Sequence, residues 1–138
     1  MVGWASSPIG PFHAFLYSNG TMQDLGTIGD GYYADSHARG INDSGQIVGE
    51  YSGQNSSGAF IYENGAMVDL NTLVDPLPGC WIGYAQAIND SGSIAATGVA
   101  PDRKYHAFLL TPVPEPSSIL LLGIGATGMA CLARCRGR

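Results

Sequence analysis

The sequence repeats itself with a spacing of 45 to 48 residues, and this limits the fold more than any other feature. Three pairs of segments carry the same residue types: His13–Gly20 with Gly58–Gly65, Met22–Leu25 with Met67–Leu70, and Gly40–Ile47 with Ala87–Ile94. A further copy of the first segment begins at His106, and Val2-Gly3-Trp4 aligns with Val48-Gly49-Glu50, so the chain starts within a unit. A fixed period of this size predicts an array of similar supersecondary units that bury their faces against one another.

Each unit predicts four short strands. In the first complete unit we expect them at residues 14–17, at residues 22–25, in a segment that ends with Ile41-Asn42, and at residues 46–49. Asn19-Gly20 predicts a tight hairpin because both residues tolerate a positive φ, and Asp43-Ser44-Gly45 predicts the next turn. Four strands in about 45 residues is the period of a β-propeller blade.

We therefore expect an all-β fold of repeated four-stranded antiparallel units over residues 1–112. Residues 1–112 would supply about two and a half β-propeller-like blades. This array is incomplete, because closed propellers have about four or more blades. Either further N-terminal blades or assembly between chains would complete the array, and a two-sheet sandwich is the rival architecture. Residues 1–15 lack the basic region and apolar core of a secretory signal, so we expect a truncated gene product, a misplaced start or a fragment.

The units resemble those of the HAF-repeat family of extracellular bacterial proteins. Two copies keep the His-Ala-Phe signature, at residues 13–15 and 106–108, and Gly58 replaces the histidine in the middle copy. The resemblance covers residues 2–112. It implies an extracellular location and a repeat architecture, and it implies no biochemical activity.

The C-terminal 26 residues have three parts in a fixed order. Val113, Pro114, Glu115 and Pro116 predict an extended strip, because proline fixes φ and pushes the preceding residue toward extended geometry. Residues 117–133 carry no charge, and as a helix they would span roughly 25 Å, which is short for a bilayer but usable. The closing residues 134–138 form a basic tail, whose Arg134, Arg136 and Arg138 predict a cytoplasmic C-terminus by the positive-inside rule. A buried core helix with a basic end is the alternative.

This tail resembles the PEP-CTERM sorting signal of Gram-negative bacteria, which consists of a Pro-Glu-Pro motif, a transmembrane helix and an arginine-rich end. The resemblance implies recognition by exosortase, an integral-membrane transpeptidase-like enzyme, and a role in bacteria that produce exopolysaccharide and form biofilms. HAF-repeat proteins often end in such tails, so the two resemblances agree.

Charge limits the partners of the domain. Before Ser117 there are three basic and eleven acidic residues, a net charge of −8, which argues against nucleic-acid binding. It would also repel an anionic polysaccharide unless cations bridge the two.

Four aromatic residues are candidates for a ligand platform, because they fall in the two long inter-strand loops at residues 26–38 and 71–85: Tyr32, Tyr33, Trp81 and Tyr84. Such side chains stack on sugar rings, although packing between units explains them as well. We expect hydrogen bonding rather than metal binding at His13 and His106, and turn chemistry rather than calcium binding at the Asn-Asp-Ser-Gly segments. Acids that recur with the repeat, such as Asp24 and Asp69, are expected to be structural.

These observations predict an exported, non-enzymatic repeat protein without metal or cofactor. Its tail would hold it briefly at the inner membrane, exosortase would cleave it, and the domain would remain at the cell surface or in the exopolysaccharide matrix. The alternatives are a carbohydrate-binding module that uses the loop aromatics, and an extracellular hydrolase.

Overall fold

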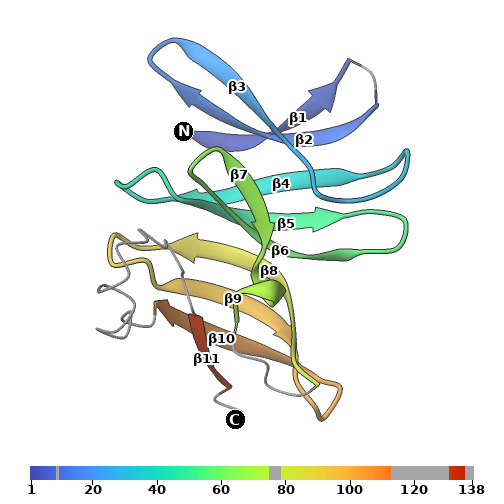
Figure 1. The fold of residues 1–138 in the computed structure, drawn as a ribbon, viewed down its shortest axis with the longest axis vertical. Helices are drawn as coiled ribbons and strands as arrows, with labels where there is room; N and C mark the ends of the chain where they lie inside the picture. Colours follow the sequence, from blue (N-terminus) through green and yellow to red (C-terminus); the bar gives the residue numbers. More distant parts are fainter. Residues whose placement is uncertain (9, 75–78, 113–130, 136–138) are drawn as a thin grey trace, which may run out of the picture.

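The computed structural model describes residues 1–8, 10–74, 79–112 and 131–135. Their strands form three antiparallel sheets that lie in a row (Figure 1). Sheet 1 has the order β1 (Val2–Ser7), β2 (Gly10–Ser18), β3 (Thr21–Gly26). Sheet 2 has the order β4 (Asp35–Ile41), β5 (Ile47–Ser52), β6 (Ser57–Glu63), β7 (Ala66–Asp69), followed by the 3-10 helix η1 (Leu70–Thr72). Sheet 3 has the order β8 (Trp81–Ile88), β9 (Ile94–Val99), β10 (Tyr105–Pro112), β11 (Cys131–Cys135).

The all-β fold with antiparallel sheets is confirmed. The three sheets stack one after another and do not close into a propeller (Figure 1).

The hairpin turns have the geometry that the sequence predicts. Asn19 and Gly20 have φ values of 52° and 77°, and Asn64 and Gly65 have 53° and 77°. Two consecutive positive φ values define the turn whose twist matches that of the flanking strands. Each Asn-Gly pair therefore fixes the register of its hairpin, in which Tyr17 lies opposite Met22 and Tyr62 opposite Met67.

The sheets are out of phase with the sequence unit. A unit counted from His13 would place β2 to β5 in one sheet, whereas sheet 2 contains β4 to β7. The loop after β3 is long enough to cross from one sheet to the next, while the short turn at residues 42–46 keeps β4 beside β5. Each complete sheet thus combines the second half of one unit with the first half of the next.

The outer strand of sheet 3 corrects the prediction for the tail. Residues 131–135 form β11, which pairs with β10 so that Pro112 lies opposite Cys131 and Phe108 opposite Cys135. The predicted helix at residues 117–133 is therefore wrong at its last three residues, and Arg134 belongs to a strand rather than to a separate basic tail. Residues 117–130, Arg136 and Arg138 lie outside the described residues.

The physical reason for this strand is a missing hairpin partner. In sheets 1 and 2 the His/Gly-Ala-Phe strand pairs with the Met-x-Asp-Leu strand that follows it. No such segment follows β10, so the outer edge of β10 has main-chain groups to pair, and β11 takes that place. Within the described ranges, no helix is long and apolar enough to cross a membrane.

Two apolar cores lie between the sheets. Between sheets 1 and 2 the fully or nearly fully buried residues include Ala14, Leu25, Ile47, Tyr51 and Phe60. Between sheets 2 and 3 a larger set includes Val48, Ala59, Ile61, Leu70, Ile82, Ile94, Phe108 and Leu110. Neighbouring residues of β6 therefore enter different cores, because successive side chains of a strand point to opposite faces. Sheet 2 is buried on both faces.

The fold predicts unequal effects for two phenylalanines. Phe60 has no exposed surface, whereas Phe12 is 47% exposed. Because Phe60→Ala leaves a cavity in the first core, we expect it to lower the free energy of unfolding by about 3–5 kcal/mol. Phe12→Ala should change it by about 1 kcal/mol or less. Urea denaturation of both variants measures the difference, and equal losses would contradict the assignment of the core.

Candidate functional sites

The predicted sorting strip lies outside the described residues. Val113, Pro114, Glu115 and Pro116 follow directly after β10, which ends at Pro112. Of the three arginines expected to set the membrane orientation, the structure describes only Arg134, in β11.

Two of the four candidate platform residues are strongly exposed. Tyr32 and Tyr33, in the loop between β3 and β4, are 74% and 79% exposed. Their ring centroids lie 5.2 Å apart and the ring planes are perpendicular. An edge-to-face pair of this kind leaves ring surface open to solvent. These two residues lie where the sequence predicts them, in an inter-strand loop.

Trp81 and Tyr84 lie elsewhere, in β8 of sheet 3, so their placement in a loop is corrected. The Trp81 indole is half-buried, packs close to Gly83, and donates its Nε1–H to the Ser57 carbonyl at 3.1 Å. That bond ties the start of sheet 3 to sheet 2. The structure therefore places two of the four aromatic residues in a loop and two in a strand of sheet 3. This is expected where β-prone aromatic residues extend a strand into a predicted loop.

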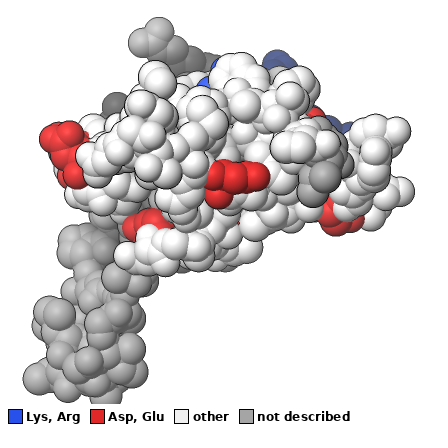
Figure 2. Space-filling view, turned by 90° about the horizontal axis from the view of Figure 1, so that it is seen from above, with Lys and Arg blue, Asp and Glu red and all other residues white. Residues whose placement is uncertain are grey.

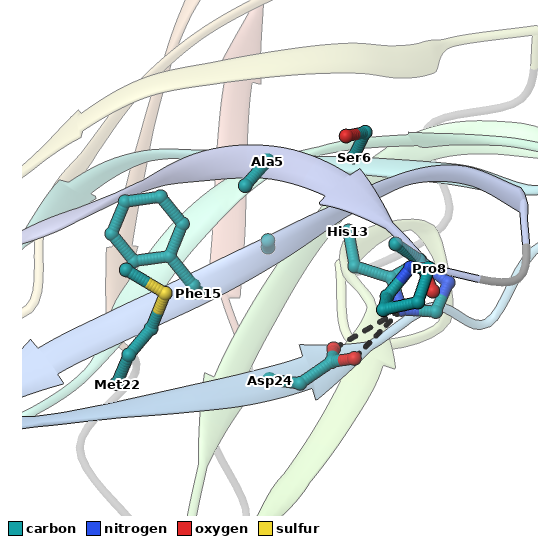
Figure 3. Close-up of a pocket in the computed structure, with 9 residues that line it drawn as sticks. Ala5, Ser6, Pro8, His13, Phe15, Met22 and Asp24 are labelled. Atoms are coloured by element: carbon teal, nitrogen blue, oxygen red, sulfur yellow. Dashed lines mark hydrogen bonds and ion pairs between the residues drawn. The ribbon is translucent and has the colours of Figure 1, made fainter.

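A pocket of about 230 Å³ lies on the face of sheet 1 that points away from sheet 2 (Figure 3). His13 and Asp24 form its polar end, where His13 Nδ1 lies 3.1 Å from both carboxylate oxygens. Phe15 and Met22 lie side by side at its apolar end (Figure 3). Burial alone would raise the pKa of Asp24, but the Gly26 N–H, at 2.7 Å, and the His13 ring together hold it below its usual value.

Repeat-equivalent residues explain this pair. His13 corresponds to Gly58 in sheet 2, and Gly26 corresponds to Asn71. A Cβ at position 58 would lie 2.9 Å from Asn71 Nδ2, so the asparagine excludes a histidine there. Each acid thus has a different side-chain partner at this place in the repeat: Asp24 binds the ring of His13, and Asp69 accepts from Asn71 Nδ2 at 3.0 Å. The repeat alignment contains this exchange, but only the structure shows that the two positions are adjacent.

The remaining histidine of the signature has a different partner. His106 Nε2 lies 2.8 Å from Asp102 Oδ2, four residues earlier in the turn before β10. The expectation that His13 and His106 serve in hydrogen bonds agrees with these contacts. Among the residues that the structure describes, no group of three or more His, Cys, Asp or Glu side chains could hold a metal ion.

Asn71 joins sheets 2 and 3. Its Oδ1 accepts the Ile82 N–H at 2.8 Å and its Nδ2 donates to the Ile82 carbonyl at 2.9 Å, so one side chain pairs with the backbone at the start of β8. Asp69 holds Asn71 in place and also accepts from the Tyr51 hydroxyl at 2.8 Å. Burial and this carboxylate raise the pKa of Tyr51 to about 12. The recurring acid thus binds the backbone and side chain of Asn71 and the hydroxyl of Tyr51.

Sequence reasoning missed a cluster at the rim between sheets 1 and 2. Arg39 forms a bidentate ion pair with Glu50, in which Nη2 lies 2.5 Å from Oε1. The guanidinium also lies 5.2 Å from the centroid of the Trp4 ring, and the His37 ring packs edge-on against the same indole. Trp4 and Glu50 occupy the same position of the repeat. The change from an aromatic to an acidic residue at this position is the signal in the sequence that could have pointed to the cluster.

Asp30 closes the loop between sheets 1 and 2. Its carboxylate accepts the backbone and side-chain N–H groups of Asn55, at 3.0 and 2.7 Å, and the Ser56 hydroxyl at 3.1 Å. The bonds from Asn55 are the main reason that the pKa of Asp30 falls to about 2. Asp30 thereby holds the loop that contains Tyr32 and Tyr33 against the β5–β6 turn. The sequence alone could not show the partner of this acid.

Comparison with known proteins identifies the tail. The PEP-CTERM protein-sorting motif matches residues 112–137. The chain carries a PEP-CTERM sorting motif. No curated protein and no solved structure matches the chain. PEP-CTERM motifs are recognised by exosortase, so this tail assigns the protein to export and to processing at the membrane. The match begins at the last residue of β10 and includes all of β11.

The Asp30 contacts predict an acid-dependent stability. A carboxyl group whose pKa is lowered on folding stabilises the native state above its ordinary pKa, and this contribution is lost as the pH falls from about 4 to about 2. Asp30→Asn should therefore destabilise the protein at pH 7, and its difference from the wild type should shrink over that interval. Thermal unfolding measured from pH 2 to pH 7 tests this.

Asp43→Asn is a matched control. The hydrogen bond with Asp90 and the charge of that neighbour raise the pKa of Asp43, so its ionised form is disfavoured on folding. This variant should be at least as stable as the wild type at pH 7, with the difference disappearing in acid. The same pH profile for both variants would contradict the roles assigned to the two acids.

Proposed function

We propose that this chain is an exported bacterial repeat protein that exosortase sorts and cleaves through its PEP-CTERM tail. The cleaved domain then resides at the cell surface or in the exopolysaccharide matrix, where it has a structural or interaction role and no enzymatic one. The inner membrane holds the precursor before cleavage.

The match of the sorting motif to residues 112–137 is the observation that carries this proposal. The strip Val113-Pro114-Glu115-Pro116 is the recognition element, and its two prolines favour the extended backbone in which proteolytic enzymes and transpeptidases bind substrates. The resemblance of residues 2–112 to HAF repeats supports an extracellular location for the domain.

The contacts of the recurring acids support a structural role. Asp24 and Asp69 each accept the backbone N–H group two residues ahead, at 2.7 and 2.9 Å. Asp90 accepts the Asp43 N–H at 2.8 Å and so joins the equivalent turns of sheets 2 and 3. Carboxylates that bind backbone groups stabilise turns, and these are the acids that would otherwise be the candidates for a pair of catalytic carboxylates.

Mass spectrometry of the mature C-terminus tests the sorting proposal. The full chain, exported behind a supplied secretory signal, is expressed in a host with exosortase and in the same host without it. We expect a mass ending near Pro116 only where the enzyme is present, and loss of that product in the Pro114→Ala/Pro116→Ala variant. Pro101→Ala, in a turn of sheet 3, is the control for loss of a proline. An intact Arg138 in both hosts would overturn the proposal.

A second function is supported by the exposure of Tyr32 and Tyr33. Two neighbouring tyrosine rings open to solvent form a surface on which sugar rings stack, and the fixed loop reduces the entropy lost on binding. Carbohydrate binding would place the domain in the matrix through these residues.

Binding to a glycan array distinguishes this second function. We expect Tyr32→Ala/Tyr33→Ala to lower glycan binding at least tenfold, because stacking contributes about 1.5 kcal/mol or more for two rings. Tyr105→Ala, a change at another exposed tyrosine, should bind like the wild type. Unchanged binding in the double variant would rule out the tyrosine platform.

A further inference from the structure

The stack of sheets ends in two different faces, the outer face of sheet 1 and the outer face of sheet 3. Each carries the residue types of one side of the contacts that join the sheets inside the chain. We propose that these faces bind each other between two copies of the chain, so that the outer face of sheet 1 packs on the outer face of sheet 3 of a second copy. This inference goes beyond the sorting function and does not depend on it.

The outer face of sheet 1 has residues that are covered in the next unit. Phe60, Tyr62 and Met67 of sheet 2 belong to the core against sheet 1. Their equivalents in sheet 1 are Phe15, Tyr17 and Met22, one repeat earlier. Tyr17 is 41% exposed and Met22 is 60% exposed, whereas Phe60 has no exposed surface. The outer face of sheet 1 thus exposes residue types that sheet 2 buries against its neighbour.

The outer face of sheet 3 has the complementary residues. Ala14 and Leu16 of sheet 1 cover sheet 2, and Ala59 and Ile61 of sheet 2 belong to the core against sheet 3. The next members of this series are Ala107 and Leu109. Ala107 is exposed and Leu109 is 57% exposed, because Phe108 and Leu110 take the inward positions.

Each end face is therefore half of an interface that the chain already forms twice. Head-to-tail contact between copies would continue the same packing, with Leu109 of one copy taking the position that Leu16 has over sheet 2. The view onto the sheet 1 end of the stack shows a mostly uncharged surface with a few isolated acidic side chains (Figure 2). Its uncharged part can lose water at low electrostatic cost, and Asp24 keeps His13 as its ion-pair partner when the face is covered.

A closed pair of copies is the assembly that we propose. Head-to-tail contacts form a closed ring when the rotation closes and an open fibre when it does not. Two copies contribute six sheets, which lies within the roughly four to eight blades of closed propellers. A closed pair leaves neither end face exposed, and it encloses the His13–Asp24 pocket within the contact (Figure 3).

Charge reversal across the contact tests the proposal. The full chain in mild detergent is studied by sedimentation equilibrium, and the wild type is expected to have the mass of two copies. Met22→Glu alone and Leu109→Lys alone should each weaken association at least tenfold. The double variant should recover it, because the two opposite charges then meet between copies. Tyr32→Lys, at an exposed loop residue outside both faces, is the control and should remain a dimer.

The result is decisive whether or not exosortase cleaves the tail. Residues 22 and 109 lie in the first and last sheets of the stack, so no contact within one chain can produce the recovery. Both side chains are exposed, and circular dichroism with thermal unfolding checks that the single variants stay folded. A monomeric wild type, or a double variant as dissociated as the single ones, would overturn the proposal.

Discussion

Burial of sheet 2 on both faces is the constraint on which this structure depends. In β6, four successive residues from Gly58 to Ile61 are buried, so neither face of that strand tolerates water. A strand of this kind cannot lie at the surface of a small sandwich, which has one solvated face per sheet. It requires a sheet above and a sheet below, and the repeat supplies both. The stacking order, the two cores and the unlike end faces all follow from this requirement.

Polar side chains at the rim set how the sheets are spaced and oriented. Asn71 pairs with the backbone of Ile82, and Arg39, Glu50 and Trp4 bridge the other junction. These contacts differ in chemistry although they serve similar junctions. Apolar packing supplies most of the stability but is not directional, whereas hydrogen bonds and ion pairs are directional and specify how one sheet meets the next.

Much of the local structure was predictable from the sequence. Asn-Gly at residues 19–20 and 64–65 determines two hairpins through local backbone geometry alone. The pairing of strands across long loops was not, because the repeat gives the period but not the point at which one sheet ends. Strand β11 was missed because its apolar composition fits a membrane helix, and the need of β10 for a partner is visible only in three dimensions.

The candidate sites divide in the same way. The sorting motif could be predicted from the sequence because its residues are contiguous in the chain. The exposed tyrosines follow from loop position, whereas Trp81 and Tyr84 joined a strand instead. The His13–Asp24 pair joins residues of two neighbouring strands, and a single sequence cannot show which positions on those strands are neighbours.

Strand β11 belongs both to the sorting motif and to the folded domain. Residues 131–135 are at once the outermost strand of sheet 3 and part of the sorting motif. A segment that pairs with β10 cannot also lie in a lipid bilayer or enter the sorting enzyme, so these two states exclude each other. Sorting as proposed would therefore require β11 to separate from β10. If exosortase removes the tail as proposed, the precursor and the cleaved domain differ at one sheet edge, because β10 then loses its outer partner.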